Sequence, residues 1–119
     1  MQRPKPEAVT LADILITEAL SRRTPRSPNW QAEAEAMRSL GRQMAQASES
    51  LMQTLVDAAL ELCQAGTAGV SLLETTPEGE EIFRWNALAG TLAPHVGGST
   101  PRNFSPCGVC LEQGTPVLF

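Results

Sequence analysis

The sequence is poor in the side chains that carry acid–base and metal chemistry. It contains no tyrosine and a single histidine, His95, among its 119 residues. One histidine excludes most catalytic and zinc sites that need two or more imidazoles from one chain. We therefore expect a protein that is not an enzyme.

Long apolar runs and blocks of positive charge are also missing. No stretch approaches the ~20 apolar residues that a membrane-spanning helix needs. The first ten residues, MQRPKPEAVT, lack the apolar core of a signal peptide. The net charge is −4 and the basic residues are scattered, so no surface for a phosphate backbone is expected. These absences predict a cytoplasmic protein that binds neither membranes nor nucleic acids.

The cysteines do not form a disulfide framework. Cys63, Cys107 and Cys110 make an odd count, and their spacing differs from that of small secreted domains. Cys63 lies on the apolar face of a predicted helix, where we expect a small buried residue rather than a metal ligand. This cysteine usage agrees with a reducing compartment.

The composition predicts one folded domain, since 42% of the residues are hydrophobic and 18% are charged. Residues 1–29 are expected to form an N-terminal extension. It would hold a short helix that begins after Thr10 and a linker over 24–29, where two prolines prevent a helix. Residues 30–119 are expected to form the domain itself.

A helix is predicted from Trp30 to about Ala47, with a narrow apolar seam. Its seam residues recur every seven positions, with two more at complementary positions: Trp30, Met37, Met44 and Leu51, then Leu40 and Ala47. This spacing suits a partner helix. Glu33 interrupts the seam, so packing of the same helix on its own domain is the alternative.

A second helix is predicted over residues 50–65. Ser50 and Gln53 match the S-x-x-Q capping box, in which each side chain binds a backbone N–H of the other residue. Gly66 is expected to end the helix. The apolar residues at helical spacing predict that this helix packs in the core.

The hydrophobic period then changes to that of strands. Residues 68–74 and 81–88 are predicted to pair as an antiparallel hairpin around the turn residues 75–79. The alternation predicts one face with Phe83, Trp85 and Ala87, and an opposite face with Ile82, Arg84 and Asn86. A third strand is predicted at residues 116–119. The predicted fold class is α+β.

A Cys-x-x-Cys pair lies in the stretch FSPCGVCL, near the end of the chain. Ser105 and Pro106 form a typical helix start, and Gly114 a typical helix end. Cys107 and Cys110 would lie one turn apart near the positive end of the helix dipole, which favours a thiolate.

Three interpretations of this pair stay open. A thioredoxin-like redox site needs a strand directly before the pair, and here a Gly- and Pro-rich loop precedes it. A structural zinc site needs four ligands, which two chains together could supply. The simplest interpretation is a capped helix that carries two small apolar residues.

The order of these elements resembles the N-terminal part of a GAF domain of the type found in bacterial sensor histidine kinases. The resemblance covers about residues 30–119 and is carried by six segments: LELCQAGTAGVSLLE at 60–74, FRW at 83–85, APH at 93–95, GSTPR at 98–102, FSPCG at 104–108 and PVLF at 116–119. Such a domain continues with further strands and a C-terminal helix. The resemblance therefore implies an antiparallel sheet that follows N-terminal helices and is truncated after its third strand.

The same resemblance implies a ligand pocket between the sheet and the helix over it. The residues expected near its mouth are Trp85, His95, Arg102, Phe104, Ser105 and Cys107. It does not specify a cofactor. In GAF domains that attach a bilin, the attachment cysteine commonly stands beside a histidine. Neither Cys107 nor Cys110 is followed by histidine, so covalent bilin attachment is not expected.

The resulting expectation is a non-catalytic sensory input and dimerisation module of a bacterial signal-transduction protein, which binds a small molecule in its pocket. A homodimer would form through the N-terminal helices or through the open sheet edge, because an unpaired strand invites pairing. The alternative is a thiol-based redox sensor that uses Cys107 and Cys110.

Overall fold

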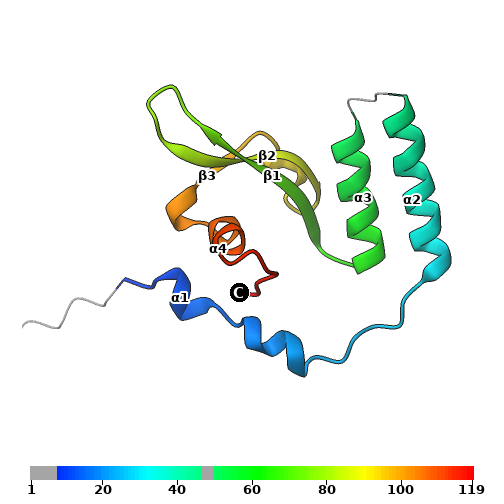
Figure 1. The fold of residues 1–119 in the computed structure, drawn as a ribbon, viewed down its shortest axis with the longest axis horizontal. Coiled ribbons are helices and arrows are strands. Elements are labelled where there is room, and N and C mark those ends of the chain that lie inside the picture. The colour runs from blue at the N-terminus through cyan, green and yellow to red at the C-terminus, as the bar shows by residue number, and fades with distance from the viewer. Residues whose placement is uncertain (1–7, 47–49) are drawn as a thin grey trace, which may run out of the picture.

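The computed structural model describes residues 8–46 and 50–119 and has the predicted α+β class (Figure 1). Its elements, in chain order, are α1 (Leu11–Ile14), η1 (Thr17–Arg22), α2 (Trp30–Ala45), α3 (Leu51–Cys63), β1 (Thr67–Thr75), β2 (Glu81–Gly90), η2 (Ala93–His95), β3 (Ser99–Pro101), η3 (Arg102–Phe104) and α4 (Pro106–Gln113). The helices near Trp30 and Ser50 and the hairpin are thus confirmed. The part of the seam at Ala47 lies outside the described residues.

The molecule is organised around one antiparallel sheet of order β1-β2-β3. In Figure 1, α2 and α3 form a helical hairpin beside the sheet, with α3 between α2 and the strands. Helix α4 lies on the other side of the β1–β2 hairpin. The segment from α1 to η1 runs past the C-terminal end of the chain.

The core between α3 and the sheet is small. Val56 of α3 is 1% exposed and packs against Ala87 and Ala89 of β2, with Leu60 and Val70 at the margin. Alanines on the strand let the helix approach closely, so little apolar area is buried per residue. The fold therefore leaves many of its larger apolar side chains at the surface.

A β-bulge corrects the predicted alternation of β2. Val70 pairs with Ala87 but Ser71 pairs with Trp85, so Asn86 is an extra residue in β2. An extra residue moves all the following side chains of the strand to the opposite face of the sheet. Ala87 therefore packs under α3, and the prediction that it shares a face with Phe83 and Trp85 is wrong.

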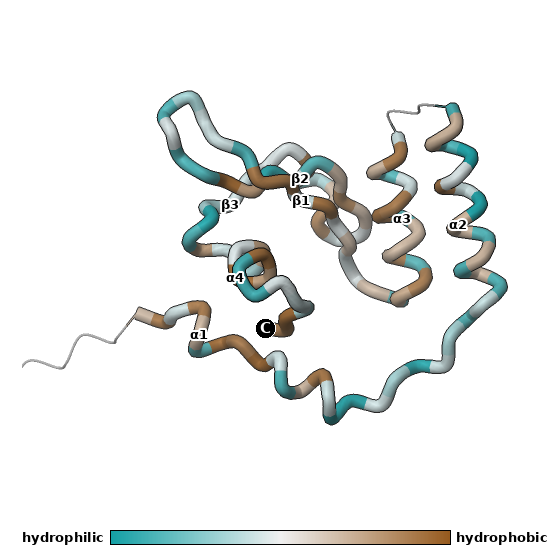
Figure 2. The backbone as a smooth tube through the Cα atoms, in the orientation of Figure 1, coloured by the Kyte–Doolittle hydropathy of each residue, from teal (hydrophilic) through white to brown (hydrophobic). Residues whose placement is uncertain are grey.

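The third strand is not where the sequence predicted it. Residues 116–119 form no strand, and β3 instead pairs with the start of β2 through Thr100 and Phe83. The C-terminal segment binds the N-terminal one: Ile16 N donates to Leu118 O at 2.7 Å, and Leu118 N to Thr17 Oγ1 at 3.2 Å. Figure 2 shows both segments as apolar. Such pairing between distant segments has no local sequence signal.

The ends of α3 also differ from prediction. The Ser50 side chain makes no capping bond to the helix, and Gln53 Nε2 instead donates to Leu88 O at 3.2 Å and to Asp57. Gln53 thus ties α3 to β2. At the other end the helix closes at Gln64, which has a φ of 49° in the left-handed region, and not at Gly66 as predicted.

Gly90 is expected to be essential where β2 ends, and Gly79 offers a matched comparison. Both have a φ near +86° (85° and 86°), but a Cβ at Gly90 would collide with Gly66 O, whereas at Gly79 it would meet nothing within 4 Å. We predict that Gly79→Ala lowers the free energy of unfolding by about 1 kcal/mol and Gly90→Ala by about 3 kcal/mol. Urea denaturation of both variants measures this, and equal losses would contradict the contact.

Candidate functional site

Helix α4 is fixed over the sheet by a buried cap. Ser105 is 1% exposed, and its Oγ accepts hydrogen bonds from Cys107 N at 3.2 Å and from Thr100 Oγ1 at 3.3 Å. Gly108 is buried, and a Cβ there would collide with Arg102 O. The predicted start of the helix at Ser105 and its end at Gly114, with a φ of 65°, are confirmed. The cap and this close contact set the height of α4 above β2.

An apolar hollow of about 670 Å³ lies between α4 and the sheet. Its floor comes from Ser71 of β1 and Phe83 of β2, which is 4% exposed. The remaining lining residues come from α4 and the segment after it: Cys107, Cys110, Leu111, Gly114, Thr115 and Pro116. An apolar lining with a few polar atoms is typical of small-molecule sites.

The two thiols border this hollow in different ways. Cys107 is half-buried, and its Sγ accepts a hydrogen bond from Ser71 Oγ at 3.3 Å. Cys110 is exposed, and its Sγ donates to Thr115 O at 3.3 Å. Within residues 8–46 and 50–119, no third histidine, cysteine or carboxylate joins them in a cluster that could hold a metal ion.

Three of the residues expected at the pocket lie at or beside the hollow. Cys107 lines it, while Ser105, two residues earlier, has its oxygen engaged by the cap. Trp85 is half-buried on the same sheet face as Phe83, since their partners Ser71 and Leu73 are two residues apart on β1. Its ring lies against Gly69, where an added Cβ would be 3.0 Å from the ring.

The other three residues point elsewhere. Phe104 is 65% exposed and does not line the hollow. His95 is exposed in η2, where its backbone N–H donates to Leu92 O at 2.9 Å. Arg102 donates from Nη1 to Glu81 Oε2 at 2.9 Å. The structure therefore does not bring these three side chains together with Cys107.

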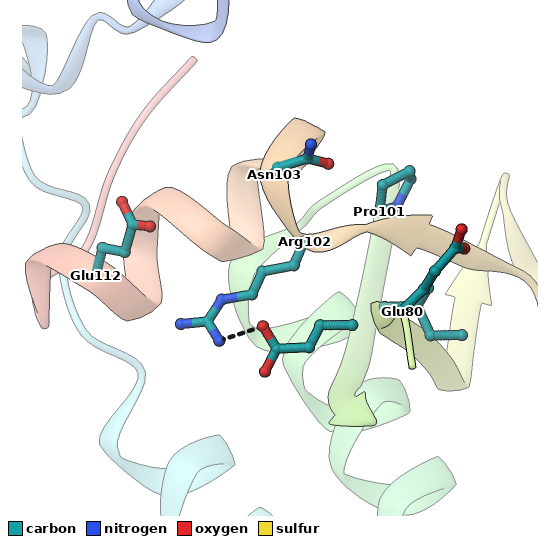
Figure 3. A pocket seen from close by; sticks show the side chains of 7 residues that line it. Glu80, Pro101, Arg102, Asn103 and Glu112 are labelled. Carbon is teal, nitrogen blue, oxygen red and sulfur yellow. Dashed lines mark hydrogen bonds and ion pairs between the residues drawn. The ribbon is translucent and has the colours of Figure 1, made fainter. Parts of the chain in front are cut away.

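Arg102 belongs to a second hollow of about 540 Å³, shown in Figure 3. Glu80, Glu81 and Glu112 also line it, so the hollow carries three carboxylates and one guanidinium. The Arg102 charge is already paired, and the surplus negative charge repels an anion. The predicted role of Arg102 toward an anionic ligand gains no support from this arrangement.

Among the lining residues that sequence reasoning did not select are Ser71, Phe83 and Leu111. A signal was available for two of them. Phe83 was predicted on the same strand face as Trp85, and Leu111 follows Cys107 by four residues, which places both on one face of a helix. Ser71 could not be found in this way, because its contact with Cys107 joins residues 36 positions apart.

Among the described residues, no helix is both long enough and apolar enough to cross a membrane. Comparisons of the chain with protein-family models, with curated proteins and with solved structures found no match. The resemblance to GAF domains is therefore a hypothesis carried by the sequence motifs alone.

Proposed function

We propose that the chain is a non-catalytic sensory input and association module that takes a small apolar molecule into the hollow under α4. The observation that carries this proposal is the hollow itself, an open apolar space bordered by a helix whose start is fixed by a buried cap. GAF-type input domains, which the sequence motifs resemble, hold ligands between a sheet and the helix above it. A cytoplasmic signal-transduction protein is the setting that this resemblance implies.

The polarity of the hollow favours a neutral ligand over a charged one. Lysine, arginine, aspartate and glutamate are absent from its lining residues. Its two thiols and the Ser71 hydroxyl are weak or already bonded polar groups. An ion placed against this lining would lose part of its hydration and gain no charged partner. A largely apolar molecule with one or two polar atoms fits this lining best.

The uncovered apolar surface supports association. Large apolar side chains are exposed on α2, α3 and β1, among them Trp30, Met37, Leu55 and Leu72. Exposed apolar surface on this scale is typical of a protein that binds a partner. A homodimer through the helices or through the free edge of β1 would cover part of it.

Leu111 at the rim of the hollow allows a direct test of ligand binding. Leu111→Asp places a charge beside the apolar lining, so we predict that the affinity for the neutral dye Nile red falls about tenfold. Fluorescence titration of the purified chain measures the dissociation constant. Leu92→Asp is the matched control, because Leu92 is similarly exposed (48% against 53%) but lies outside the hollow. Equal effects of the two changes would mean that the dye binds elsewhere.

A thiol-based sensor is the second candidate, and it rests on the position of both thiols at one hollow. Oxidation would join Cys107 and Cys110 in a disulfide, and the two electrons and two protons would pass to an oxidant such as diamide. Forming that bond would break the contact of Cys107 with Ser71, and so move α4 relative to β1.

Serine substitutions separate the two candidates. In a Cys63→Ser background, which removes the third, exposed thiol, we predict that Cys107→Ser/Cys110→Ser leaves association unchanged. The effect of diamide on dye binding and on association should be equally small in the chain that keeps Cys107 and Cys110 and in the chain that lacks them. If diamide changes either property at least severalfold only when the pair is present, the thiol sensor is the better account.

A further inference from the structure

The outward face of α2 carries an apolar stripe that no other part of the described chain covers. Trp30, Met37 and Met44 are each two turns apart, with exposed fractions of 73%, 68% and 67%. Helix α3 packs against a different face of α2, which includes Ala32 and Ala36. In Figure 1, α2 lies at the outer edge of the molecule, with α3 on its inner side. The stripe is therefore accessible along its whole length.

Small residues occupy the positions between the three large ones. Ala34 and Gly41 follow Trp30 and Met37 by four residues each, so the five residues form one band at heptad spacing. This corrects the predicted seam: Leu40 is half-buried, and Leu51 belongs to α3. The stripe is thus made of residues from α2 alone.

No contact in the described part of the chain explains the glycine at position 41. Glycine is unfavourable in the middle of a helix, and a Cβ at Gly41 would meet nothing within 4 Å. What glycine does provide is room for another backbone to approach closely. Its place between Met37 and Met44 puts that room at the centre of the exposed stripe.

The charges beside the stripe specify the direction of a partner helix. Glu33 borders one side of the stripe and Arg38 the other, both are exposed, and neither has an ion-pair partner among the described residues. In a parallel, in-register pair of helices, residues that flank the seam meet five positions apart, which brings Glu33 to Arg38 of the second copy. An antiparallel pair joins like flanks and leaves both charges unmatched.

We propose that α2 pairs with α2 of a second copy, parallel and in register, through the stripe of Trp30, Ala34, Met37, Gly41 and Met44. Gly41 marks the closest approach, and two Glu33–Arg38 ion pairs close the interface on either side. The inference rests on the association part of the proposed function and supplies its partner and geometry. The stripe spans about 21 Å of helix, so a weak, reversible dimer is expected.

Disulfide trapping tests the direction. In a chain with Cys63, Cys107 and Cys110 replaced by serine, Trp30→Cys and Met44→Cys are made separately and oxidised with copper phenanthroline, alone and mixed. We expect each variant alone to form covalent dimers, since equivalent positions face each other. Mass spectrometry distinguishes them from mixed dimers. Predominantly mixed dimers would indicate antiparallel helices and overturn the inference.

Charge reversal tests the flanks. Glu33→Lys and Arg38→Glu should each weaken the dimer about tenfold in sedimentation equilibrium, because two attractive pairs become repulsive. The double variant should restore the original affinity. Arg42→Glu is the matched control, since Arg42 is also exposed on α2 but lies away from the stripe, and it should have little effect. Absence of rescue in the double variant would overturn the proposed pairing.

Gly41→Leu tests the close approach without disturbing the monomer. The new side chain enters open space within the chain, so circular dichroism should show equal or greater helix content, while the dimer should weaken at least tenfold. If the dimer tolerates Gly41→Leu and the trapping test also fails, the chain associates through a surface other than the α2 stripe. The parallel α2 pairing is then overturned, while the association part of the proposed function stands. A chain that is monomeric at millimolar concentration would overturn both.

Discussion

The contact of Val56 with β2 is the interaction on which the rest of the structure depends. It is the most buried apolar contact between the helical hairpin and the sheet, and it sits over Ala87 and Ala89 directly beyond the β-bulge. Helix α2 packs mainly on α3. The position of the proposed dimer stripe relative to the sheet therefore depends on this one small core between α3 and β2. Gln53, which donates to Leu88 O, is the polar part of the same connection.

The bulge lets β2 contribute side chains to both faces of the sheet within a few residues. Phe83 faces the hollow under α4, and Ala87, four residues on, faces α3. Without the extra residue, both would lie on the same face of the sheet. Under the proposed function, a ligand that displaces Phe83 or α4 would act on the strand that carries α3, and through α3 on α2. The fold thus offers a short path of packed elements between the proposed ligand site and the proposed interface.

The sequence predicted what is encoded locally. The Ser105-Pro106 start and the Gly114 end of α4 follow from caps, and the presence of α2, α3 and the hairpin follows from periodicity and turn residues. The misses arise from non-local contacts. Asn86 is bulged because of how β1 and β2 align, and residues 116–119 bind Ile16 instead of adding a strand. Of the predicted site, Cys107 reaches the hollow, whereas Arg102 is drawn to Glu81.

The central claim is that this chain covers its exposed apolar surface by pairing with a second copy and leaves a pocket for a small molecule. A native mass spectrum of the purified chain, compared with its denatured mass, tests this most directly. The account predicts a dimer of twice the 12.8 kDa chain mass, with added mass that disappears on denaturation when a ligand is retained. A bare monomer at every concentration would contradict it.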